Sequence, residues 1–101
     1  MKRQAMTDGN GNWFNIESAD CFNEDSNWNG SNNISLATGS QTEHEVLYRT
    51  ISGKWVLNTW SQCQGITETW EIVDDEFAAR WLVTNNQNSD IVSEQIEELE
   101  I

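Results

Sequence analysis

His44 is the only histidine in this 101-residue chain, and it stands between two carboxylates, Glu43 and Glu45. A histidine paired with a carboxylate is common material for a general acid–base centre. The surrounding residues are predicted to form a β-strand, however, and successive side chains of a strand point to opposite faces. Neither flanking carboxylate would then lie beside the imidazole, so we interpret His44 as an ordinary surface histidine. Cys63 falls in a polar turn, and the chain has no second histidine to activate it as a nucleophile. We therefore expect no catalytic residues and no enzymatic activity.

The other candidates for binding chemistry are clustered carboxylates and the two cysteines. Asp74, Asp75 and Glu76 are consecutive, but a helix N-cap and the first turn of a helix both favour acidic side chains. A structural zinc site needs about four ligands, and Cys21 and Cys63 lie far apart with no CxxC spacing. We interpret both cysteines as small buried apolar residues and leave open a disulfide between them. The sequence predicts no metal site and no cofactor.

The charge of the chain is strongly negative and unevenly distributed. The sequence has 17 acidic and 5 basic residues, a net charge of -12. Ten of the acids fall in residues 68–101, where Arg80 is the one basic residue. This excess argues against direct binding to nucleic acid or to an anionic membrane, and it favours encounter with basic proteins. A surface that is acidic only for solubility is the simpler alternative.

Length and composition indicate one domain over residues 1–101. No run of about 18 apolar residues could span a membrane, and no apolar stretch follows Lys2 and Arg3 to make a signal peptide. We therefore expect a cytoplasmic protein. Residues 1–12 are polar and are interpreted as a flexible leader. Residues 26–42 are rich in Asn, Ser and Gly and are expected to form a long loop.

The clearest pattern is a β-hairpin formed by residues 44–51 and 54–61. A two-residue Ser52-Gly53 loop would pair Thr50 with Trp55 and Tyr48 with Leu57, all on one face. Residues 67–73 alternate as a third strand. These runs predict an α+β fold with a three-stranded antiparallel meander, which a strand near Trp13 could extend to four strands, and with helices packed on one face.

Three helices are expected around this sheet. The first begins at Ser18 and reaches about Asp25. In the second, Asp74 is the N-cap, and an apolar stripe faces inward. The third is an acidic helix over residues 90–101, which the spacing of three apolar residues makes amphipathic. The stripe of the second helix consists of Phe77, Ala78, Trp81 and Leu82, and the apolar residues of the third are Val92, Ile96 and Leu99.

Part of the chain resembles a known kind of sequence. The pattern reads ATGSQTEHEVLYRT at 37–50 and GKWVLN-x-WS at 53–61, then QG at 64–65, E-x-W at 68–70 and AA-x-WL at 78–82. Over residues 37–84 it is similar to small uncharacterised bacterial, phage and plasmid reading frames, which carry no activity to transfer. In size, acidity and lack of catalytic motifs the whole chain resembles anti-CRISPR and other phage anti-defence proteins. That resemblance implies an inhibitor that occupies a basic nucleic-acid-binding surface of its target.

Two functions therefore remain as hypotheses. The first is an acidic inhibitor of a basic partner protein, such as a CRISPR effector, acting in the cytoplasm of the host. The second is a structural or regulatory interaction module, for instance a homodimer formed through Trp60 and the seam of Val92, Ile96 and Leu99. The residues predicted to contact a partner are Asp74, Asp75, Glu76, Glu94, Glu97, Glu98 and Trp60.

Overall fold

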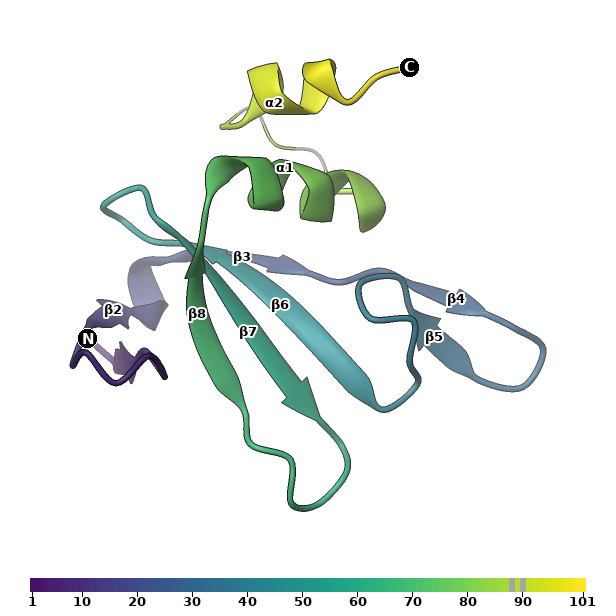
Figure 1. Cartoon of the computed structure of the whole chain (residues 1–101), viewed down its shortest axis with the longest axis horizontal. Coiled ribbons are helices and arrows are strands. Elements are labelled where there is room, and N and C mark those ends of the chain that lie inside the picture. Colours follow the sequence, from purple (N-terminus) through teal and green to yellow (C-terminus); the bar gives the residue numbers. More distant parts are fainter. Residues whose placement is uncertain (88, 90) are drawn as a thin grey trace.

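A four-stranded antiparallel sheet with the strand order β3-β6-β7-β8 forms the centre of the computed structural model, which describes residues 1–87, 89 and 91–101 (Figure 1). Its strands are β3 (Asp20–Asn23), β6 (Glu43–Arg49), β7 (Trp55–Ser61) and β8 (Thr69–Val73). The predicted α+β class and the β6-β7-β8 meander are confirmed. The fourth strand, however, is β3 and not the segment around Trp13.

The β6–β7 hairpin has a different register from the predicted one. Arg49 pairs with Trp55, Leu47 with Leu57 and Tyr48 with Val56. The amide of Thr50 donates to the carbonyl of Lys54 at 2.8 Å, so that three residues form the loop, and Gly53 has a φ of 89°. A three-residue hairpin loop commonly ends on such a left-handed residue. Since a shift of one residue moves side chains to the opposite face, the predicted common face for Thr50, Trp55, Tyr48 and Leu57 is wrong.

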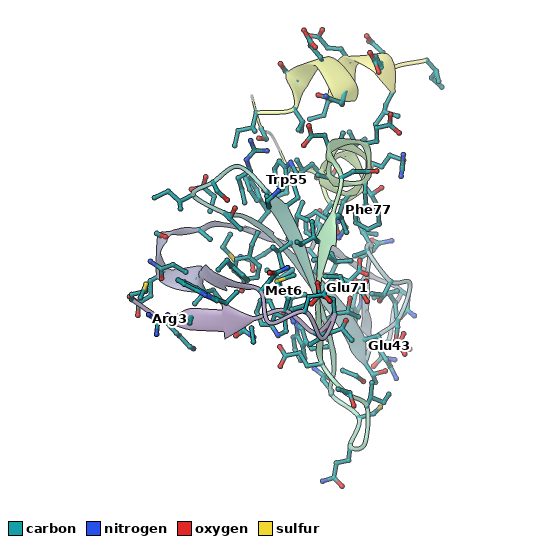
Figure 2. The ribbon with its side chains drawn as sticks, turned by 60° about the vertical axis from the view of Figure 1, so that its left-hand side comes forward. Arg3, Met6, Glu43, Trp55, Glu71 and Phe77 are labelled. Carbon is teal, nitrogen blue, oxygen red and sulfur yellow. The ribbon has the colours of Figure 1, made fainter. Side chains whose placement is uncertain are left out.

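One face of the sheet packs against helix α1 (Asp75–Thr84). The main core consists of Leu47, Trp55 and Leu57 from the strands together with apolar residues of the helix. The predicted stripe of α1 is confirmed, since Ala78, Trp81 and Leu82 are buried and Phe77 packs against the same core. Figure 2 shows Trp55 and Phe77 on the side of the sheet that α1 covers.

The other face of the sheet carries a second core, covered by the N-terminal segment. Strands β1 (Arg3–Ala5) and β2 (Trp13–Asn15) pair with each other, and Met6 and Phe14 pack on Val56 and Trp70. The hydroxyl of Thr7 accepts a hydrogen bond of 2.9 Å from the amide of Trp70. Residues 1–12, predicted to be a flexible leader, therefore contribute a strand, a buried methionine and contacts with β8.

The helix predicted from Ser18 to Asp25 is not present. A 3₁₀ turn, Ile16–Ser18, leads directly into β3, which pairs with the edge of β6. An isolated helix of eight residues is marginal in water, whereas a strand here satisfies its backbone groups along β6. Phe22 reaches the main core from this strand.

Residues 26–42, predicted to be a long loop, contain a short hairpin of β4 (Ser26–Trp28) and β5 (Asn33–Ser35). It extends from the end of β3 away from the helices (Figure 1). Trp28 is 61% exposed on this hairpin.

Helix α1 begins at the cap residue that its sequence predicts. The Oδ1 atom of Asp74 accepts a hydrogen bond of 2.8 Å from the amide of Phe77, and this contact caps the helix. Beyond its last turn, Asn86 has a positive φ of 57°, a conformation that asparagine tolerates better than most residues.

The buried side chain of Asn85 joins the C-terminal end of α1 to the short segment between β3 and β4. The side chain of Asn85 is 1% exposed. Its Oδ1 accepts from the amide of Asp25 at 3.0 Å, and its Nδ2 donates to the carbonyl of Trp81 at 2.9 Å. On the surface nearby, Nδ2 of Asn86 donates to Oδ2 of Asp25 at 2.8 Å. This bond and one from the amide of Ser26 lower the pKa of Asp25.

Helix α2 (Ser93–Glu98) is shorter than the predicted helix over 90–101, and Asp90 lies outside the described residues. Both figures place α2 against α1 on the side away from the sheet (Figures 1 and 2). The expectation of helices on one face holds for α1, whereas α2 forms a further layer upon it. Among the described residues, no helix is long and apolar enough to cross a membrane.

Candidate functional site

The six carboxylates predicted to face a partner all belong to one layer of the molecule, made of the cap residue Asp74, helix α1, helix α2 and residues 99–100 that follow α2. We call it the acidic helical layer. Its described part has seven carboxylates and one basic side chain, Arg80. All of the carboxylates are exposed, and they are Asp74, Asp75, Glu76, Glu94, Glu97, Glu98 and Glu100.

Two of these carboxylates have contacts within the fold. Asp74 caps α1, as described above. The Oδ1 atom of Asp75 accepts a hydrogen bond of 3.0 Å from Nε1 of Trp55 and lies 4.0 Å from a guanidinium nitrogen of Arg49. The same guanidinium lies over the Trp55 ring, 4.9 Å from its centre. Asp75 therefore helps to fix a core tryptophan, which the sequence pattern did not indicate.

The carboxylates of α2 have no such role. Among the described residues, no ion pair and no side-chain hydrogen bond involves Glu94, Glu97 or Glu98. The helix also lacks a side-chain cap at its N-terminal residue, Val92. Glu94 lies in the first turn of α2, where the helix dipole favours a negative charge. Glu97 and Glu98 have no such position.

Trp60 lies apart from the acidic helical layer. It is on the face of the sheet opposite α1, where it pairs with His44 across β6 and β7. The two rings stack with centroids 4.6 Å apart, and Trp60 is 36% exposed. The sheet thus separates Trp60 from the six carboxylates, and the predicted contact residues do not form a single surface.

The predicted dimer seam is largely used inside the molecule. Val92 is 2% exposed and belongs to the main core, and Ile96 packs against that core. Leu99 is the member of the seam that remains exposed. The packing of α2 on α1 therefore leaves little of the seam for a second copy.

His44 is not the surface histidine that the sequence predicted. Its side chain is 19% exposed, and its Nδ1 atom lies 2.7 Å from Oε1 of Glu24. The flanking carboxylates do not contact the ring, as expected, but Glu24 reaches it from the chain beyond β3. The same Oε1 atom accepts the amide of Glu45 at 3.2 Å. Twenty residues separate Glu24 from His44, so no local motif could reveal this pair.

The outward atoms of this pair are also buried. Within the described part of the chain, Nε2 of His44 and Oε2 of Glu24 have no hydrogen-bond partner. Trp60 stacks on the ring of His44, with the ring centroids 4.6 Å apart. The pair therefore links β6 to the chain after β3.

Glu45 connects this region to α1 on the other face of the sheet. Its Oε1 atom accepts a hydrogen bond of 3.1 Å from Nε1 of Trp81. Burial raises the pKa of Glu45, the hydrogen bond from Trp81 partly opposes this, and the charge of Glu24 adds to the rise. The ionised form of Glu45 therefore lowers the stability of the folded protein relative to the protonated form.

The two cysteines and Tyr48 are the other candidate groups for chemistry. Cys21 and Cys63 are free and exposed, so the interpretation of both as buried apolar residues is wrong. Across the described residues, no three His, Cys, Asp or Glu side chains are placed to hold a metal ion. Burial, with the neighbouring Cys21, raises the pKa of Tyr48 to about 12.

Comparisons with known proteins add no relative, since no family model, curated protein or solved structure matches the chain.

Proposed function

We propose that this protein is an acidic protein-binding module whose helical layer engages a basic surface of a partner protein. The specific form of this proposal is an inhibitor that occupies the nucleic-acid-binding surface of a defence complex such as a CRISPR effector. The observation that supports it is the set of unpaired carboxylates on α2, namely Glu94, Glu97 and Glu98. Like charges on one short helix repel each other, and no cation of the described chain forms an ion pair with them.

The acidic helical layer suits a partner better than a catalytic role. Surface charges of this kind raise the rate of association with an oppositely charged protein, and the effect weakens as salt rises. Asp75 and Asp74 would contribute less than the α2 carboxylates, because both already accept hydrogen bonds in the fold. Trp60 lies on the face of the sheet opposite α1, so a partner bound to the acidic helical layer would reach Trp60 only through a second, separate contact.

The test compares two variants with the same change in net charge. One carries Glu94→Lys, Glu97→Lys and Glu98→Lys, and the other carries Asp20→Lys, Glu43→Lys and Glu71→Lys. The control residues are exposed carboxylates of β3, β6 and β8, and Figure 2 labels two of them, Glu43 and Glu71. The readout is competition with a fluorescent DNA duplex for a panel of basic nucleic-acid-binding proteins that includes CRISPR effectors.

We expect the wild-type protein and the control to displace the duplex from at least one member of the panel. The α2 variant should do so at least about tenfold less well, with a weaker dependence on salt. If both variants lost the same share of their ability to displace the duplex, binding would depend on net charge and not on the position of the α2 carboxylates. Absence of displacement from every protein of the panel would reject the inhibitor proposal.

A further inference from the structure

A groove of about 700 Å³ lies on the face of the sheet away from α1. Its floor includes Val56 and Phe14 of the second core, and its sides include β2 and the turn between β6 and β7. Ligand pockets in proteins commonly have volumes of about 300–1,000 Å³. The groove is thus large enough for a small molecule, and it is separate from the acidic helical layer.

Large apolar side chains gather at this groove and remain in contact with solvent. Trp13 and Ile72 are each 49% exposed, and Ile51 of the β6–β7 turn is 84% exposed. Scattered exposed apolar residues need no explanation, but a group around one concave surface indicates a binding site. These three come from β2, the turn and β8, which are distant in sequence and are brought together by the fold.

The charge of the groove is opposite to that of the protein. No carboxylate lines it, although the chain has 17 acidic residues, and the one charged side chain in its lining is Lys54. Lys54 has no ion pair among the described residues. Next to the groove, the guanidinium of Arg3 lies 4.9 Å from the centre of the Trp13 ring. These features favour a ligand that is apolar along most of its length and negatively charged at one end.

We propose that the groove binds a monomeric amphipathic anion of the fatty-acid class. The alkyl chain lies over Val56, Phe14 and Ile72, and the carboxylate pairs with the ammonium group of Lys54. Hydroxyl groups at the same turn, those of Thr50 and Ser52, lie 3.1 Å apart and line the groove. This binding is independent of the partner proposed for the helical layer.

Calorimetric titration with sodium dodecanoate below its micellar concentration tests this proposal. We expect binding with one site per chain. Lys54→Gln should weaken the affinity about fivefold, the upper range for one exposed ion pair. Ile72→Glu places a carboxylate in the groove and should weaken binding at least about tenfold. The matched control is Ile66→Glu, since Ile66 is 53% exposed outside the groove, and it should bind like the wild type.

Further ligands separate the proposal from other uses of the same surface. Dodecyltrimethylammonium has the same chain with a positive head group and should bind at least about fivefold more weakly than dodecanoate. Absence of dodecanoate binding, equal affinity for both amphiphiles, or equal weakening by Ile66→Glu would overturn the proposal. Flotation with anionic vesicles without binding of free dodecanoate would assign the surface to a membrane. Sedimentation as a dimer that dodecanoate does not dissociate would assign it to a second copy.

Discussion

Replacing Asn85 by alanine is expected to destabilise the protein more than any surface substitution in the same region. The side chain of Asn85 is almost completely buried and joins two parts of the fold. It accepts the amide of Asp25 and donates to the carbonyl of Trp81. No other side chain is recorded as the acceptor of that amide in the described chain, so Asn85→Ala leaves it without a partner.

The two lost hydrogen bonds are not equal in cost. The amide of Asp25 is partly buried, so leaving it without a partner costs about 1–2 kcal/mol, the lower part of the range for a buried group. The carbonyl of Trp81 keeps the backbone amide of Asn85 as a donor at 3.0 Å, so losing the bond from Nδ2 costs less, about 0.5–1 kcal/mol. The free energy of unfolding should therefore fall by about 1.5–3 kcal/mol. For a domain of this size, that change corresponds to a decrease in Tm of roughly 6–24 °C.

Urea denaturation followed by tryptophan fluorescence and by far-ultraviolet circular dichroism measures this change. The control is Asn27→Ala, because Asn27 is an exposed residue of β4 and no side-chain hydrogen bond is recorded for it. We expect the control to stay within about 0.5 kcal/mol of the wild type. An Asn85→Ala protein as stable as this control would refute the assignment of Asn85 as the link between α1 and β3.

Two further substitutions test the main core and Glu45, the carboxylate whose pKa is raised by burial. Since the pKa of Glu45 is raised in the folded state, its carboxyl group favours folding at acidic pH, and that contribution is lost as pH rises through the folded pKa. Glu45→Gln keeps the acceptor for Trp81, so its stability relative to the wild type should increase between pH 4 and pH 7. A stability difference that stays constant over this range would contradict the raised pKa of Glu45. Leu47 is fully buried between β3 and β7, and Leu47→Ala should lower the free energy of unfolding by about 3 kcal/mol in urea denaturation. A loss below about 1 kcal/mol would place Leu47 outside a tightly packed core.

The elements with strong local signals are the ones that the sequence predicted correctly. Helix α1 has an acidic cap at Asp74 and an apolar stripe, and both are local patterns within one helix. The meander follows from alternation and short connections. The register of β6 and β7 was missed because the turn uses three residues, with Gly53 as its left-handed member.

What the sequence did not predict depends on contacts between distant residues. Residues 20–23 have no strong strand pattern and become β3 because β6 offers an unpaired edge. The pair of Glu24 and His44 and the groove at Lys54 likewise require strands that are far apart in the chain. The spacing of Val92 and Ile96 indicated an apolar face on α2, but it did not indicate whether that face would pack inside the molecule or against a second copy.

The contact between Thr7 and Trp70 sets an order of events during synthesis. The two residues are 63 positions apart, and Trp70 is part of the surface on which Met6 and Phe14 are buried. A ribosome adds about 5–20 residues per second, so the N-terminal hairpin waits roughly 3–12 seconds before this partner has been made. During that interval Tyr48 and Val56 have been made, but the surface that Met6 and Phe14 cover still lacks Trp70. The nascent chain therefore presents these apolar groups to chaperones well before the second core can close.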